Sequence, residues 1–215
     1  MNFWNQQFSL PDFKYGKQPN SFLREQAFRL SPGSTVLLPG DGEGRNSVWL
    51  AQQGHHVTAM DNSCVGLQKA QELAAEKGVE IEVVQADLEH WTPAPASFDA
   101  LVLTYVHLPP GLRAQAHQRL VQALRPGGWL ILEAFHPRQL GRQSGGPKDA
   151  AMLYTLDMLR SDLAAASCLE DVIAWEGEAL LNEGSGHQGL AFLTRYVAQR
   201  APNLSPLSPA LATKN

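Results

Sequence analysis

Apolar and polar positions along this chain alternate between short apolar runs and amphipathic stretches. Five runs have strand length and are bounded by turn residues: 36–38, 56–60, 79–86, 100–106 and 129–135. The segments between most of them show the three-to-four-residue apolar spacing of helices. Strands that alternate with helices form a mostly parallel sheet covered on both faces. The pattern therefore predicts a doubly wound α/β fold.

Helix ends are marked in the sequence. A helix predicted after residues 56–60 has Ser63 as its N-cap and Gly78 as the residue that ends it. An earlier amphipathic stretch, 47–53, stops at a glycine, and a later one carries apolar residues from 112 to 124 and stops before Pro126. These signals place helices between the predicted strands.

The C-terminal third departs from this alternation. After a Gly-rich loop at 141–147, the pattern predicts a helix over 150–163 and two strands, 171–181 and 190–198, joined by residues 182–189. We expect an antiparallel hairpin that completes a seven-stranded, Rossmann-like sheet. If its first strand runs parallel to the others, the hairpin tip lies at the carboxyl edge of the sheet, where ligands bind.

Composition agrees with one domain over residues 1–200, of which residues 1–34 form an N-terminal lead-in. Seventeen basic and 21 acidic residues give a net charge of −4, which argues against nucleic acid as a partner. The sequence shows no membrane-spanning run and no export leader, so we expect a cytoplasmic protein. Cys64 and Cys168 have no metal-type spacing and are expected to be free thiols. Residues 201–215 lack periodicity and are expected to be disordered.

The sharpest motif follows the first strand. Gly40, Gly42 and Gly44 alternate with polar residues before a helix begins, which lets a ligand approach the backbone closely. A dinucleotide fingerprint would need its third glycine at position 45, where this chain has Arg45. The spacing therefore suits S-adenosylmethionine, which carries no pyrophosphate, better than a dinucleotide.

Two further strand ends support an adenosine site. Asp61 ends the second strand and offers a carboxylate to both ribose hydroxyls. Asp87 and Leu88 follow the third strand and offer a polar group to the adenine amine and an apolar side chain to its ring. We expect these strand ends to converge on one adenosine.

Residues 40–46, 57–63 and 125–128 together resemble the class I S-adenosylmethionine-dependent methyltransferases. The lead-in 14–23, Lys-Tyr-Gly-Lys-Gln-Pro-Asn-Ser-Phe-Leu, is most similar to the tellurite-resistance methyltransferase type. The resemblance implies S-adenosylmethionine as cofactor. It also implies the following cofactor-binding residues: Tyr15, Gly40, Asp41, Gly42, Glu43, Gly44, Arg45, Asn46, Asp61, Asn62, Ser63, Asp87, Leu88 and Thr104.

One position departs from the family pattern. Most members have an acidic residue where this chain has Leu38, two residues before the first glycine. That acid orders the loop or lies near the methionine amine. Asp41 and Glu43 are the candidates to replace it.

Acceptor contacts are expected from the histidines at the carboxyl edge: His107, His136 and His187. Direct displacement at a sulfonium methyl needs the acceptor held in line and water excluded, and a general base is optional. A small soft nucleophile fits, such as a thiol or a selenium or tellurium oxyanion, with Arg138 and Arg142 available to an anion. We expect no metal site, and we expect the remaining histidines to face solvent: His55, His56, His90 and His117.

Three interpretations remain. The first is a small-molecule methyltransferase, and the second is a module that binds S-adenosylmethionine or S-adenosylhomocysteine without turnover. The third, a nicotinamide-dependent oxidoreductase, is disfavoured by Arg45 and by the closing hairpin. Residues 104–111 also lack the Asp/Asn-Pro-Pro-aromatic motif of enzymes that methylate nucleic-acid amino groups.

Overall fold

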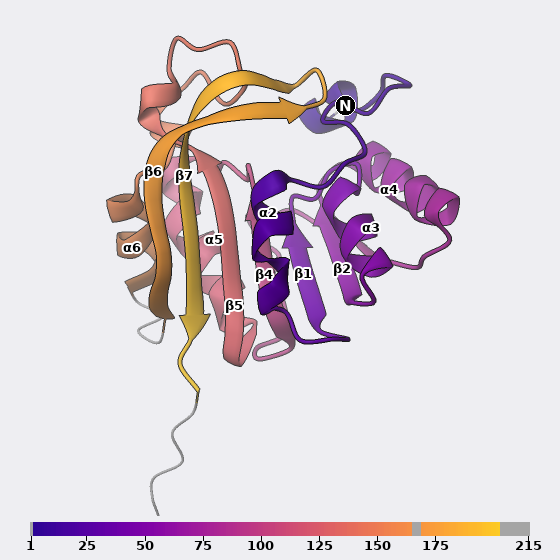
Figure 1. Cartoon of the computed structure of the whole chain (residues 1–215), viewed down its shortest axis with the longest axis horizontal. Helices are drawn as coiled ribbons and strands as arrows, with labels where there is room; N and C mark the ends of the chain where they lie inside the picture. The colour runs from indigo at the N-terminus through magenta and orange to yellow at the C-terminus, as the bar shows by residue number, and fades with distance from the viewer. Residues whose placement is uncertain (1, 165–168, 203–215) are drawn as a thin grey trace, which may run out of the picture.

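The computed structural model describes residues 2–164 and 169–202. Its seven strands form one sheet in the order β3-β2-β1-β4-β5-β7-β6, which confirms the predicted fold class (Figure 1). The strands are β1 Thr35–Pro39, β2 His56–Asp61, β3 Glu82–Gln85, β4 Phe98–Thr104, β5 Leu124–Phe135, β6 Leu169–Glu183 and β7 His187–Arg200. Cys168 and residues 203–215 of the predicted tail lie outside the described residues.

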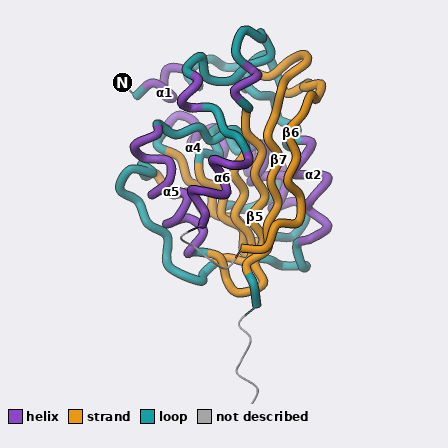
Figure 2. The backbone as a smooth tube through the Cα atoms, turned by 90° about the vertical axis from the view of Figure 1, so that its left-hand side faces the viewer, coloured by secondary structure: helices purple, strands orange, loops and turns teal. Residues whose placement is uncertain are grey.

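Helices cover both faces of the sheet. The α-helices are α1 Phe3–Gln7, α2 Ser21–Gln26, α3 Arg45–Gln52, α4 Cys64–Lys77, α5 Pro110–Gln122 and α6 Leu156–Leu163. Short 3-10 helices are η1 Ala27–Arg29, η2 Pro137–Gln139 and η3 Ala150–Met152. Figure 2 shows α2 on one side of the sheet and α5 and α6 on the other.

The alternation of side chains along β1 builds the two halves of the core. Val36 and Leu38 pack with Phe22 of α2 and Leu50 of α3, whereas Leu37 packs in the cluster that contains residues of α5 and α6. Successive residues of a strand point to opposite faces, so one apolar run serves both layers. The continuous apolar character of the central strands follows from this double burial.

The carboxyl ends of the parallel strands meet at one edge. Pro39 pairs with Met60, and Thr104 pairs with Glu133, so β1, β2, β4 and β5 end together. Strand β7 is antiparallel to both β5 and β6, and β6 therefore runs in the same direction as β5. The β6–β7 tip lies at the carboxyl edge, as expected, although β6 itself pairs only with β7 and forms the sheet edge.

Several element boundaries differ from the sequence predictions. The predicted helix over 150–163 is divided into η3 and α6, because Tyr154 N–H donates to the Phe135 carbonyl and the Tyr154 side chain is fully buried. Strand β4 ends at Thr104, because Tyr105 adopts a φ of 57°. The hairpin turn is short, since β6 and β7 extend to Glu183 and His187.

Candidate cofactor and acceptor site

The glycine turn after β1 is hydrogen-bonded to the end of β2. The Asp61 carboxylate accepts from Gly42 N–H at 2.9 Å through Oδ2 and from Ser63 N–H at 2.8 Å through Oδ1. Gly40 N–H donates to the Met60 carbonyl at 2.7 Å. A carboxylate has about four lone-pair positions, so Asp61 retains acceptor capacity for two hydroxyls. Burial raises its pKa above the ordinary value.

The backbone conformation and close neighbouring atoms require glycine at the three positions of the turn. All three have φ between 63° and 85°, which favours glycine. A Cβ on Gly42 would lie 3.0 Å from Cζ of Phe8, and one on Gly44 would lie 2.5 Å from Cβ of Ala70. A side chain at position 42 would therefore meet the Phe8 ring of the lead-in.

Asp41 and Glu43, the two candidates to replace the usual acid, differ in their partners. Glu43 accepts from Lys14 N–H at 2.8 Å and from Lys69 Nζ at 2.5 Å, so both its oxygens are engaged. Asp41 accepts from the Ser47 hydroxyl at 2.5 Å through Oδ2. Its Oδ1 is enclosed and has no hydrogen-bond partner in the described parts of the chain. Burial, the largest cause, raises the pKa of Asp41 to about 7.

The predicted adenine contacts lie beside this turn. Asn62 Nδ2 donates to Asp87 Oδ2 at 3.3 Å, and the Ala86 N–H donates to the Asp61 carbonyl. Asp87 is exposed, whereas Leu88 is buried in the cluster under α5. Ser63 is fully buried and caps α4, since its hydroxyl accepts from Gly66 N–H.

A buried polar network, which the sequence patterns did not reveal, lies next to the turn. Arg45 pairs with Glu183 at 2.7 Å, and both side chains are 7% exposed. Asn20, the N-cap of α2, donates from Nδ2 to Glu133 at 2.6 Å and to Glu183 at 3.0 Å. Arg195 supplies the second cation of the network and donates to Glu133 at 2.6 Å. The network therefore contains two cations and two carboxylates, and it ties the lead-in to β5 and to the hairpin.

Asn46 and Thr104, both predicted at the cofactor, join the same network. Asn46 Oδ1 accepts from Asn20 N–H, and its Nδ2 donates to the Thr104 hydroxyl, each at 2.8 Å. The structure thus brings the first turn of α3 against the end of β4. Charged or amide side chains inside apolar strands, such as Glu133 in β5, were the available sequence signal.

The lead-in crosses the carboxyl edge and contacts the hairpin tip. Lys69 of α4 donates to the Leu10 and Asp12 carbonyls at 2.8 and 2.9 Å as well as to Glu43. Gly186 N–H donates to the Lys14 carbonyl at 3.0 Å. A Cβ on Gly186 would lie 2.4 Å from the Tyr15 ring. Tyr15 thus lies over the edge, whereas Phe22 is buried against the sheet.

His187 lies at the start of β7 inside an aromatic enclosure. Its ring centroid lies 4.3 Å from those of Tyr15 and Tyr105 and 5.1 Å from that of Phe135. The side chain is 5% exposed, and Nδ1 lies 3.8 Å from Glu183 Oε2. Nδ1 has no hydrogen-bond partner among the residues described. Burial lowers the pKa of His187.

The other two predicted acceptor histidines form hydrogen bonds with backbone groups. His107 Nδ1 lies 2.6 Å from the Met152 carbonyl, and its Nε2 accepts from Phe135 N–H at 3.2 Å. Burial lowers the pKa of His107 to about 4. His136 Nδ1 accepts from Arg138 N–H, and the ring packs on Phe192. Both ring nitrogens of His107 therefore have backbone partners, whereas Nε2 of His136 lies 3.6 Å from Glu176 Oε1.

One histidine expected at the surface is buried. His117 is 2% exposed and lies 3.0 Å from Asp162 Oδ2, which also pairs with Arg113 at 2.6 Å. This corrects the solvent-facing prediction. The apolar stripe of the helix did not reveal it, because the partner carboxylate is 45 residues away in α6.

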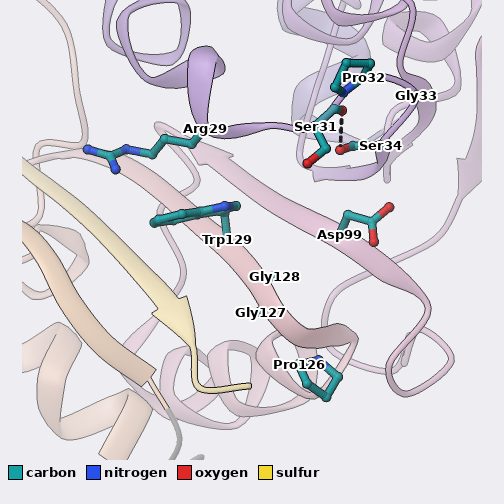
Figure 3. Close-up of a pocket in the computed structure, with 10 residues that line it drawn as sticks. All are labelled: Arg29, Ser31, Pro32, Gly33, Ser34, Asp99, Pro126, Gly127, Gly128 and Trp129. Carbon is teal, nitrogen blue, oxygen red and sulfur yellow. Dashed lines mark hydrogen bonds between the residues drawn. The ribbon is translucent and has the colours of Figure 1, made fainter. Parts of the chain in front are cut away.

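A hollow also lies at the opposite, amino edge of the sheet, and it is drawn in Figure 3. Residues that line it include Arg29, Asp99 and Trp129, all remote from the glycine turn along the strands. Within residues 2–164 and 169–202, no helix is long and apolar enough to cross a membrane. The same residues contain no group of three or more His, Cys, Asp or Glu arranged to hold a metal ion.

Comparison with known families finds a match over the segment that contains the glycine turn. Residues 36–128 match a family described as a methyltransferase domain. The chain is 31% identical over 105 residues to the uncharacterized methyltransferase YodH of Bacillus subtilis, covering 47% of this chain and 43% of that protein. The part of the chain that contains the glycine turn and Asp61 is therefore similar to methyltransferase domains.

Two further relatives have named acceptors or acceptor classes. A 2-heptyl-1-hydroxyquinolin-4(1H)-one methyltransferase of Mycobacteroides abscessus is 30% identical over 115 residues, 52% of this chain and 51% of the relative. A probable thiol methyltransferase 2 of Arabidopsis thaliana is 30% identical over 121 residues, 54% and 51% of the two chains. The chain spans about half the length of the curated relatives it matches.

Solved structures share the fold. A protein of echinomycin biosynthesis, described for conversion of a disulfide bond into a thioacetal group, superposes with a TM-score of 0.72 at 18% identity, covering 91% of this chain and 86% of that one. TehB from Haemophilus influenzae superposes with a TM-score of 0.69 at 17% identity, covering 92% and 66%. At these identities the likeness is one of fold.

Proposed function

We propose that this methyltransferase domain transfers the methyl group of S-adenosylmethionine to a small molecule with a soft nucleophile. The observation that carries the proposal is the glycine turn, which contains Asp41 and lies beside Asp61. It falls within the segment that matches the methyltransferase family. Asp61 would accept from the ribose hydroxyls, and Asp87 would accept from the adenine amine. When bound, S-adenosylmethionine supplies an activated methyl group and its own leaving group.

Asp41 is the residue that fits the methionine amine. Its Oδ1 is enclosed without a partner, whereas both oxygens of Glu43 are engaged. A buried carboxylate oxygen without a partner is costly, and an ammonium group would satisfy it. Asp41 would thus replace the acid that the family places two residues before the first glycine.

The relatives support a small-molecule acceptor. One is named for a heptyl-hydroxyquinolone and another for thiols, and their names favour turnover over a module that only binds the cofactor. The lead-in resembles the tellurite-resistance type, and TehB shares the fold of this chain. We therefore place the acceptor among small, soft nucleophiles.

Calorimetric titration with S-adenosylmethionine and S-adenosylhomocysteine tests the proposal. Asp41→Ala should weaken S-adenosylmethionine binding about 10- to 100-fold, because a hydrogen bond to a charged group contributes about 1.5–3 kcal/mol. Asp157→Ala removes a carboxylate that is 98% exposed on α6 and serves as the matched control. Failure of the wild-type chain to bind either compound would overturn the proposed function.

A further inference from the structure

We propose that the aromatic enclosure of His187 is the acceptor subsite, that it takes a neutral thiol, and that His187 accepts the thiol proton. Tyr15, Tyr105 and Phe135 form its walls. This inference rests on the proposed function and adds to it the class of the acceptor and the residues that would bind it.

Sheet order places the enclosure beside the cofactor turn. Tyr105 directly follows β4, Phe135 ends β5 and His187 begins β7, and β4 is the neighbour of β1. Arg45, the first residue of α3, lies with its guanidinium 6.0 Å from the Tyr15 ring. A molecule against His187 would therefore adjoin the glycine turn.

Polar atoms without partners mark this enclosure as a binding site. The Tyr105 hydroxyl and His187 Nδ1 are both enclosed and have no hydrogen-bond partner in the described chain. A buried polar atom that is left unsatisfied destabilises the folded protein. A bound methyl acceptor that offers one hydrogen-bond donor and one hydrogen-bond acceptor would satisfy both atoms.

Backbone strain occurs at the same place. Tyr105 has a φ of 57°, a conformation that a bulky side chain rarely adopts and that concentrates at functional sites. Its N–H donates to the Glu133 carbonyl at 2.8 Å, which holds the ring between Phe135 and His187. The ring centroids of Tyr105 and Phe135 lie 4.8 Å apart and are stacked.

The surrounding charges argue for a neutral acceptor. Arg45 is paired with Glu183, and Lys14 Nζ donates to Gln7 at 2.6 Å. Arg142, predicted as an anion contact, pairs with Glu178 at 2.6 Å. An oxyanion would lose its hydration without gaining an unpaired cation, whereas sulfur packs favourably against aromatic rings. A thiol therefore fits better than a selenium or tellurium oxyanion.

The chemical step balances with groups at hand. A lone pair on the acceptor sulfur forms the bond to the methyl carbon as the bond from that carbon to the sulfonium sulfur breaks, with its electron pair left on that sulfur. The S–H proton passes to Nδ1 of His187 and then to solvent. Because burial lowers the pKa of His187, the ring is neutral near pH 7 and able to accept this proton.

Several titratable groups face or surround His187: Lys14, Tyr15, Arg45, Tyr105, His107 and Glu183. Burial raises the pKa of Tyr15 to about 12 and that of Tyr105 well above its ordinary value, so both hydroxyls stay protonated. Burial raises the pKa of Glu183, but the His187 ring, 3.8 Å away, and the ion pair with Arg45 outweigh this and bring it to about 2. With both hydroxyls protonated and Glu183 ionised, His187 is the group of the enclosure that takes up the thiol proton.

The test measures initial rates of S-adenosylhomocysteine formation at saturating S-adenosylmethionine. The acceptors are benzenethiol, 2-mercaptoethanol, phenol, selenite and tellurite. His187→Gln should lower kcat for 2-mercaptoethanol about 100-fold or more. Its effect on the more acidic benzenethiol should be much smaller, because that thiol ionises without a base. His56→Gln, at the exposed start of β2, is the control and should match wild type.

Binding measurements complete the test. Tyr105→Phe should weaken the calorimetric affinity of benzenethiol for the complex with S-adenosylhomocysteine several-fold, while the affinity for S-adenosylhomocysteine itself stays within about twofold. An equal loss of kcat for both thiols in His187→Gln would make His187 structural and overturn its role. Methylation of selenite or tellurite in preference to every thiol, or of no thiol by protein that binds the cofactor, would overturn the acceptor class and leave cofactor binding intact.

Discussion

The Ser47 hydroxyl donates to one carboxylate oxygen of Asp41 at 2.5 Å and leaves the other oxygen enclosed without a partner. Ser47 lies in the first turn of α3 and Asp41 in the glycine turn, so the hydrogen bond fixes the direction of the carboxylate. The free Oδ1 therefore has a defined position before any ligand binds. This preorganisation is the basis of the first prediction.

Asp41→Asn should change stability in a pH-dependent way. Burial raises the pKa of Asp41 from 3.8 to about 7, so the folded state binds this proton more tightly than the unfolded chain. The corresponding stability is fully present below pH 3.8 and is lost as pH rises through about 7. Because Asn stays neutral, Asp41→Asn should raise the melting temperature relative to wild type more at pH 8 than at pH 5. A difference independent of pH would contradict this assignment.

Asp61→Ala should weaken the cofactor site and also destabilise the ligand-free protein. The carboxylate accepts from both Gly42 N–H and Ser63 N–H, and each bond to a charged group contributes about 1.5–3 kcal/mol. Thermal melting of the apo form and calorimetry with S-adenosylhomocysteine should both show a loss. Asp87→Ala, at an exposed position, should reduce cofactor affinity with little change in melting. Unchanged apo stability in Asp61→Ala would contradict the role of Asp61 in holding the turn.

Gly42→Ala should lower apo stability for two reasons: the new Cβ would meet the Phe8 ring, and the backbone at position 42 has a φ of 63°. Strain in this region costs about 1–3 kcal/mol. Phe8→Leu should relieve the contact but not the backbone strain, so the double variant should lose less stability than the sum of the single variants. Denaturant unfolding of the four proteins measures this coupling. Strict additivity would show that only the backbone conformation matters.

Lys69→Met should loosen the lead-in. The ammonium group donates to Glu43 and to the carbonyls of Leu10 and Asp12, and Met keeps most of the side-chain length without the charge. Limited proteolysis should cut within residues 8–16 faster than in wild type. Lys17→Met, which removes an exposed pair with Glu76, is the control. Equal cleavage in both variants would show that Lys69 does not hold the segment.

The sheet could be predicted well from the sequence because a strand that is buried on both faces is apolar at nearly every position. Central strands such as β4 are nearly continuous apolar runs, and the ends of α4 carry Ser63 and Gly78, which cap it as predicted. The glycine turn was visible because only glycine adopts its backbone conformation without cost. These features are local, and local patterns were sufficient to find them.

What the sequence did not show depends on contacts between distant residues. Tyr105 extends an apolar run and looks like part of a strand, yet its φ of 57° turns the backbone away while its N–H still bonds to Glu133 of another strand. Glu133 and Arg195 interrupt apolar strands, but nothing in their spacing indicates that they pair. Similarly, His107 and His136 follow strands as acceptor residues would, while their ring nitrogens meet backbone groups.

The junction between residues 14–16 and 184–186 is built mainly from backbone atoms. Gly186 N–H meets the Lys14 carbonyl, and Gly16 and Gly184 approach each other through main-chain atoms. The side chains of Tyr15 and His187 pack against each other beside it and take no part in these main-chain contacts. Evolution can therefore exchange these two side chains, and with them the preferred substrate, while the frame that joins the two ends of the chain stays the same.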